Sequence, residues 1–161
     1  MEHAADGLFS NAPIVTWTRG QNEEVYWKTG AGHQGGYAYR LCKVPQEGAI
    51  HLVTEKCFND GHLKFAGDIS WVYKGIGSEE DVYDPSKWEA MPLLRVTTGT
   101  FPEGSEWAKI PVPKHDDGGW GIKDLVEVPA DLEPGHYVLS FRWDCKKSPQ
   151  IWNSCANIDI I

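Results

Sequence analysis

His33 lies in sequence surroundings that suit metal chemistry. It belongs to the stretch GAGHQGGY, residues 30–37, where glycines on both sides leave the imidazole unshielded and allow the backbone to bend tightly. A histidine presented in this way at the edge of a β-sandwich can reach a metal ion. A purely structural histidine is the alternative for His33, and it is the role we expect for the remaining five: His3, His51, His62, His115 and His136.

The sequence lacks the motifs of common hydrolases. The G-x-S-x-G pattern does not occur, and Gly104-Ser105 lacks the strand–turn–helix context of a nucleophile elbow. Acidic residues gather in polar stretches such as 79–81 and 116–117, and the second of these lacks the twelve-residue pattern of a calcium loop. A glycosidase with two carboxylates stays open as an alternative, but no pair of residues stands out for it.

The four cysteines are Cys42, Cys57, Cys145 and Cys155. An even number in a chain rich in turns predicts disulfides and an oxidising compartment, and the spacing does not fit a zinc site. Three pairings are possible. The local one, Cys42–Cys57 with Cys145–Cys155, closes short loops, and a loop of ~15 residues contributes about 3 kcal/mol to stability.

Length and charge restrict the classes of partner. The chain has 161 residues, which suits one domain, and 41% of them are hydrophobic. Its formal net charge of −8 disfavours contact with phosphate backbones, so we expect no nucleic-acid partner. No apolar run reaches the ~18 residues that a membrane-spanning helix needs, so we expect no membrane partner.

Tryptophan is unusually abundant. The chain has eight tryptophans, six tyrosines and five phenylalanines. Tryptophan fills β-sandwich cores, but its ring also stacks on flat ligands, including sugars. Trp120, within the sequence GGWG, is a candidate for such a sugar contact.

Apolar residues alternate with polar ones more often than they follow a helical period, which predicts an all-β fold. The stretch 136–144 (HYVLSFRWD) alternates most clearly. Residues 54–58 are expected to form a short helical turn that Thr54 caps. Regularly spaced short strands between Pro and Gly turns favour a two-sheet β-sandwich with long loops. The expected strands are 14–17, 23–28, 37–44, 63–65, 69–73, 94–98, 107–112, 121–128, 136–144 and 156–161.

A single sandwich domain is expected over residues 13–161. Residues 1–12 have neither the basic start nor the apolar stretch of a signal peptide, and we expect a disordered or truncated tail there. Because disulfides imply export, we expect that upstream sequence is missing or was processed away.

Three pieces of the chain carry a family resemblance. They are HQGGYAYRLC (33–42), PGHYVLSFRWDC (134–145) and PQIWNSCANI (149–158). In this order they resemble the lytic polysaccharide monooxygenases, and the similarity runs from about Pro13 to the end. The resemblance implies a secreted, monomeric enzyme on an immunoglobulin-like or fibronectin-like sandwich. Such enzymes use one copper ion and an external electron donor to cleave chitin, cellulose or related polysaccharide surfaces oxidatively.

The same resemblance assigns roles to three residues. The family holds copper between the amino group and imidazole of an N-terminal histidine and an internal histidine, which His33 matches. Trp152 matches an aromatic residue on the axial side of the copper, where Tyr or Phe is commoner. Gln150 matches a glutamine that hydrogen-bonds to oxygen species near the metal.

The start of the chain departs from this pattern. The sequence begins Met1-Glu2, and His3 can offer only the generic copper chelation of a peptide N-terminus. We therefore expect weak copper binding and impaired cleavage. The alternatives are a non-catalytic carbohydrate-binding sandwich, which would use exposed aromatic residues, and a structural or copper-carrying domain.

Overall fold

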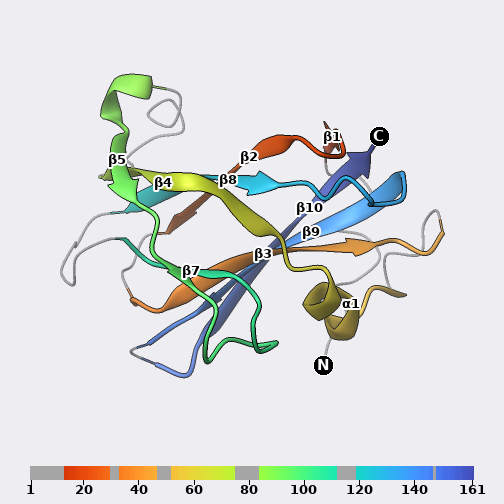
Figure 1. The fold of residues 1–161 in the computed structure, drawn as a ribbon. Coiled ribbons are helices and arrows are strands. Elements are labelled where there is room, and N and C mark those ends of the chain that lie inside the picture. Colours follow the sequence, from red (N-terminus) through yellow and green to blue (C-terminus); the bar gives the residue numbers. More distant parts are fainter. Residues whose placement is uncertain (1–12, 30–32, 47–51, 75–83, 112–118, 147) are drawn as a thin grey trace.

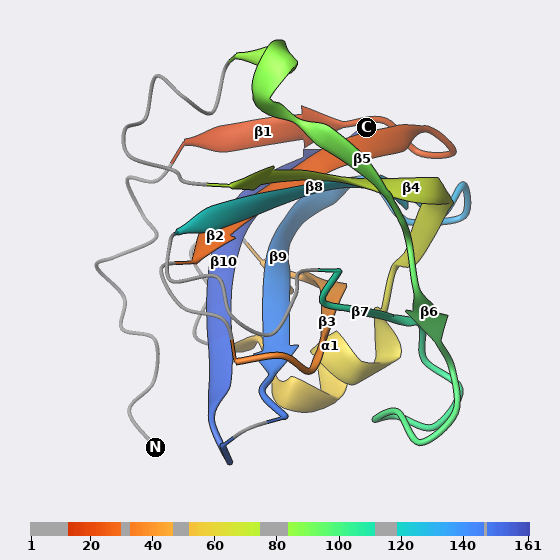
Figure 2. The same cartoon turned by 90° about the vertical axis from the view of Figure 1, so that its left-hand side faces the viewer.

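The computed structural model describes residues 13–29, 33–46, 52–74, 84–111, 119–146 and 148–161. In these ranges the strands form two sheets that face each other (Figures 1 and 2), which confirms the predicted two-sheet β-sandwich. One sheet has the order β1-β10-β9-β3-β7-β6 and the other β2-β8-β4-β5. The elements are β1 (Ile14–Trp17), β2 (Asn22–Thr29), β3 (Gly36–Lys43), α1 (Glu55–Asp60), β4 (Lys64–Lys74), the 3-10 helix η3 (Pro85–Lys87), β5 (Glu89–Pro92), β6 (Arg95–Val96), β7 (Trp107–Lys109), β8 (Trp120–Glu127), β9 (Gly135–Asp144) and β10 (Ile151–Ile160).

Strand β9 holds the larger sheet together, because it pairs with both β3 and β10. Its alternating pattern buries Tyr137, Phe141 and Trp143 on the face toward the second sheet. Trp143 lies opposite Tyr37 on β3 and opposite Trp152 on β10, so one row of aromatic residues crosses three strands.

The smaller sheet has β2 at one edge, beside β8. Its strand β4 joins the two strands predicted at 63–65 and 69–73, with a register shift between Ala66 and Trp71. Gly67 takes a positive φ of 70° within this irregular stretch. The break in alternation made one bulged strand look like two in the sequence.

A buried polar cluster lies inside the apolar core. Asp124 of β8 accepts hydrogen bonds from the Ser70 hydroxyl on β4, at 2.5 Å, and from the Tyr39 hydroxyl on β3, at 3.0 Å. All three residues are buried. Burial raises the pKa of Asp124, and the hydroxyl hydrogen bonds act in the opposite direction by stabilising the carboxylate. The Tyr39 bond connects the two sheets.

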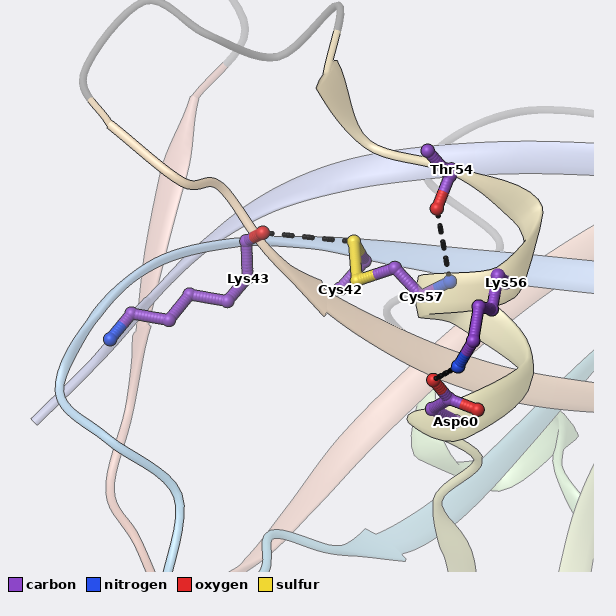
Figure 3. The surroundings of a disulfide bond; sticks show 6 residues. All are labelled: Cys42, Lys43, Thr54, Lys56, Cys57 and Asp60. Carbon is purple, nitrogen blue, oxygen red and sulfur yellow. Dashed lines mark hydrogen bonds and ion pairs between the residues drawn. A yellow bond between two sulfur atoms is a disulfide. The ribbon is translucent and has the colours of Figure 1, made fainter.

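Helix α1 is attached to β3 by a disulfide between Cys42 and Cys57 (Figure 3). The Thr54 hydroxyl accepts a hydrogen bond from the Cys57 N–H at 3.2 Å, as the predicted cap requires. Within the described ranges the helices are too short and too polar to cross a lipid bilayer.

Cys145 and Cys155 are free thiols, so the predicted disulfide between them is wrong. The Cys145 N–H donates to the Gln150 carbonyl at 3.1 Å, whereas Cys155 lies opposite Ser140. Cys155 is therefore five residues along β10 from the position facing Cys145, roughly 17 Å at the rise of a strand. A disulfide cannot span that separation.

Candidate functional site

A cavity of about 570 Å³ opens where β2 and β9 end and β10 begins. This end lies at the left in Figure 1 and faces the viewer in Figure 2. Both His33 and Trp152 line the cavity, so the fold brings together the two residues that the sequence singled out. The other lining residues are Tyr26, Trp27, Lys28, Thr29, Phe141, Trp143, Asn153 and Ser154.

Trp143 positions the segment that carries His33. The imidazole and the Trp143 indole are in contact, with 5.9 Å between ring centroids and 52° between ring planes. The Trp143 indole N–H also donates to the Gln34 carbonyl at 2.9 Å. Gln34 has a φ of 53°, a rare value for a residue other than glycine, so this backbone bends sharply beside the ring.

Gly35 permits the close approach of this segment to β9. Its φ is 105°, and a Cβ atom there would lie only 2.0 Å from the Asp144 carbonyl oxygen. The Gly35 carbonyl accepts a hydrogen bond from Ile110 at 3.1 Å, so the segment is fixed on both sides. The glycines around His33 therefore serve a tight packing arrangement as well as the exposure of the imidazole.

Trp152 lies directly across from Trp143 on β10, and 51% of its surface is exposed. Its position places an accessible indole beside the buried one that contacts His33. The cavity thus offers one imidazole and one exposed aromatic ring. Such a site can bind a metal ion and a flat organic molecule close together.

No family model matches this chain. It is 28% identical to "AA13 family lytic polysaccharide monooxygenase A" of Aspergillus terreus, over 94% of this chain and 42% of the relative. It is 25% identical to "Lytic polysaccharide monooxygenase aasB" of Emericella nidulans, over 92% of this chain and 50% of the relative.

The chain is lytic polysaccharide monooxygenase-like. It spans about half the length of the curated relatives that it matches. A solved structure, "Lytic Polysaccharide Monooxygenase AA15 from Thermobia domestica in the Cu(I) State", matches with a TM-score of 0.51 at 18% identity, over 91% of this chain and 62% of that one. That structure supports the sandwich fold.

Trp27 forms the floor of the site in this monooxygenase-like chain. Its ring centroid lies 4.5 Å from that of Phe141 and 5.4 Å from that of Trp143. No motif marks this role in the sequence, although the inward position of Trp27 on β2 follows from strand alternation. Trp27 keeps the Trp143 ring from moving inward, away from His33.

Two further sequence predictions meet different outcomes. Trp120 is 1% exposed and packs against Trp27, so its prediction as a sugar contact is wrong: it points into the core from β8. Gln150 is exposed in the turn before β10, where its side-chain carbonyl accepts a hydrogen bond from the Ser148 hydroxyl at 3.0 Å. It does not line the cavity of His33, and its role near a metal stays a prediction.

The described residues do not form a complete copper site. His33 is the imidazole donor in the cavity lining, and no group of three or more His, Cys, Asp or Glu side chains in the described ranges could hold a metal. A tetragonal copper site built from nitrogen ligands requires more donors than this.

Cys145, two residues after Trp143 in the chain, adds no strong ligand either. Burial raises the pKa of its thiol, and a hydrogen bond with Trp152 partly opposes this effect. The thiol therefore stays protonated at neutral pH, whereas metals and electrophiles react with the thiolate.

Proposed function

We propose that this chain carries the internal-histidine half of the site of a copper-dependent enzyme that oxidatively cleaves polysaccharide. The supporting observation is the shared cavity of His33 and Trp152. The names of the sequence relatives support the same reaction class. Chitin, cellulose or a related polymer is the proposed substrate, with an external electron donor as partner.

His33 is the residue that would bind copper, and Trp152 is the aromatic residue that would lie beside the bound ion. Gln150 completes the proposed catalytic set. A secreted monomer is proposed as well, and the Cys42–Cys57 disulfide supports an oxidising compartment.

This polypeptide by itself is proposed to be impaired, because its described residues place one imidazole in the cavity. Isothermal titration with Cu(II) tests this directly. We expect weak binding, part of which is lost in His33→Ala. A His3→Ala background removes the imidazole that supports chelation by the peptide N-terminus, which lies outside the described residues.

His136→Ala is the matched control. His136 lies near the start of β9, at the end of the strand away from the cavity, and its ring pairs with Asp159 at 2.9 Å. The Cu(II) electron paramagnetic resonance spectrum should lose an imidazole nitrogen in His33→Ala and stay unchanged in His136→Ala. Nanomolar Cu(II) binding by the His3→Ala protein would contradict the proposed impairment, and an unchanged spectrum in His33→Ala would contradict the assigned ligand.

A non-catalytic carbohydrate-binding sandwich is the second candidate. The exposed ring of Trp152 favours it, since stacking on a sugar needs no metal. Incubation with chitin, cellulose or starch, ascorbate and copper separates the two functions. Oxidised oligosaccharides in the mass spectrum indicate the enzyme, and retention on the polymer without such products indicates the binding module.

A further inference from the structure

A second cavity, of about 550 Å³, lies at the outer face of the larger sheet, where β7, β3 and β9 run side by side (Figure 1). Gly36 of β3 stands there in register between Lys109 of β7 and Asp144 of β9. Tyr37 is buried in the core, so Gly36 and its two partners face outward. Adjacent strands lie roughly 4.8 Å apart, so the backbones on either side of Gly36 are about 10 Å from each other.

Gly36 leaves the middle of this row without a side chain. A Cβ atom there would lie 3.3 Å from the Ala108 carbonyl oxygen and 3.7 Å from a ring carbon of Trp107. The Trp107 indole N–H donates to the Ser105 hydroxyl at 3.0 Å, which fixes the ring as one wall of the cavity. The hollow above Gly36 is therefore built into the sheet.

The turn that carries Phe101 forms another wall of this cavity. The Phe101 ring is 60% exposed and lines the cavity. The Ser105 N–H and hydroxyl both donate to the Pro102 carbonyl, at 3.0 and 2.6 Å, and the Gly99 N–H donates to the Glu103 carboxylate at 3.1 Å. A ring presented on an ordered turn loses little conformational entropy when a ligand binds.

The charge of the cavity is opposite in sign to that of the protein. Lys109 and Lys146 line it, and among the described residues Asp144 is the one acidic side chain of the lining. Both carboxylate oxygens of Asp144 accept hydrogen bonds from Arg142, at 2.7 and 3.0 Å, so Asp144 is neutralised by a residue outside the lining. An excess of positive charge in a protein with a net charge of −8 favours an anionic ligand.

The apolar part of the lining restricts the ligand further. Phe101, Val96 and Ile110 line the same cavity as the lysines. A bare inorganic anion would leave this apolar surface in water, and a neutral aromatic molecule would leave the lysines without a partner. The volume is in the range of roughly 300–1,000 Å³ that is usual for sites of small organic ligands. A flat ring that carries a carboxylate satisfies both parts of the lining.

We propose that this cavity binds a planar aromatic carboxylate, whose ring lies over Gly36 beside Phe101 and whose carboxylate pairs with Lys109 and Lys146. The inference goes beyond the proposed function and does not rest on it, because the cavity is separate from that of His33.

An NMR titration of the copper-free protein tests this inference, with cinnamate as the probe and cinnamamide as its neutral counterpart. Cinnamate should bind saturably with a Kd of about 1 mM or tighter. Amide shifts should concentrate in residues 34–36, 99–101 and 108–110. Cinnamamide should bind roughly fivefold or more weakly, and added salt should weaken the binding of cinnamate alone.

Variants separate the two contributions to binding. Phe101→Ala should weaken the binding of cinnamate roughly three- to tenfold, the worth of one aromatic contact. The double variant Lys109→Gln/Lys146→Gln should weaken it by a similar factor and leave the affinity for cinnamamide unchanged.

Matched variants control for unspecific effects. Phe101→Trp keeps a ring, and Lys109→Arg/Lys146→Arg keeps both charges, so each should bind cinnamate within about twofold of wild type. Lys64→Gln removes an exposed lysine of β4 outside the cavity and should change nothing. Thermal melting checks that each variant is folded.

The inference is overturned if cinnamate causes no saturable shifts, or if cinnamamide binds equally well. Unchanged affinity in Phe101→Ala or in the double glutamine variant overturns it too, as do shifts centred on the cavity of Trp152. Because the titration contains no copper, its result is independent of whether His33 binds that metal.

Discussion

The indole N–H of Trp143 donates a 2.9 Å hydrogen bond to the backbone carbonyl of Gln34, the residue that follows His33. A buried strand residue thereby fixes the bend that presents the imidazole. The orientation of His33 depends on the sandwich core, because the ring of Trp143 packs on Trp27 beneath it.

Trp143→Phe should loosen the segment around His33. The substitution keeps an aromatic ring but leaves the Gln34 carbonyl without its donor, and a lost hydrogen bond costs about 1 kcal/mol. Amide hydrogen exchange should accelerate at residues 34–36. Trp120→Phe is the control, because the buried indole N–H of Trp120 has no partner among the residues described. Equal exchange rates at residues 34–36 in both variants would contradict the role of Trp143.

Gly35→Ala should destabilise the protein strongly. The added methyl group would clash with the Asp144 carbonyl, and its φ of 105° is unfavourable for alanine. We expect a loss of more than about 2 kcal/mol in urea unfolding. Gly104→Ala shares a positive φ of 85° but meets no atom within 4 Å, so it should cost about 1 kcal/mol. A smaller loss in Gly35→Ala than in Gly104→Ala would argue against the clash.

The disulfide between Cys42 and Cys57 should contribute measurably to stability. It closes a loop with a sequence separation of 15, for which the chain-entropy model gives about 3 kcal/mol. The double variant Cys42→Ala/Cys57→Ala should therefore melt at a lower temperature than wild type under non-reducing conditions. Cys155→Ser should melt close to wild type, since Cys155 is a free thiol. A large loss in Cys155→Ser would reveal a second covalent link.

Stability should fall on mild acidification because of His62. Burial, followed by the nearby charges of Arg40 and Arg142, lowers the pKa of His62 from 6.5 to about 4. The unfolded chain therefore binds the proton more readily than the folded one. The contribution of the neutral His62 ring to the free energy of unfolding is fully present above pH 6.5 and is lost as the pH falls toward 4.

His62→Gln tests this pH dependence, because glutamine has a similar reach and does not titrate. The free energy of unfolding, measured in urea, should fall less between pH 7 and pH 4 in the variant than in the wild type. The expected difference is on the order of 1 kcal/mol after allowance for partial solvent screening. Identical slopes in the variant and the wild type would show that other groups govern the acid response.

Much of this architecture follows from the sequence. The alternation in 136–144 predicted the central strand almost to the residue, and the predicted cap of α1 by Thr54 is confirmed. The short strand β5 was missed because a four-residue stretch with Pro92 has no clear pattern. β10 was predicted too short because Trp152 and Ser154, on the face toward the second sheet, are exposed at the cavity rather than buried.

The site was predictable only in part. The motifs of His33 and Trp152 selected two residues that share a cavity, whereas Trp27, which also lines it, has no motif around it. The disulfide between Cys145 and Cys155 was predicted wrongly because closeness in the sequence says nothing about strand register. The register places the two thiols far apart along one hairpin. Register depends on long-range pairing and is hard to infer from spacing.

The hydrogen bond from Tyr39 to Asp124 has a consequence for the whole sandwich. Apolar side chains attract one another without regard to direction, so two facing sheets held by them alone can slide. A buried hydrogen bond from β3 to β8 tolerates little sliding, because sliding would remove one of the donors that satisfy the buried Asp124 carboxylate. This bond therefore restrains the sideways movement of one layer over the other.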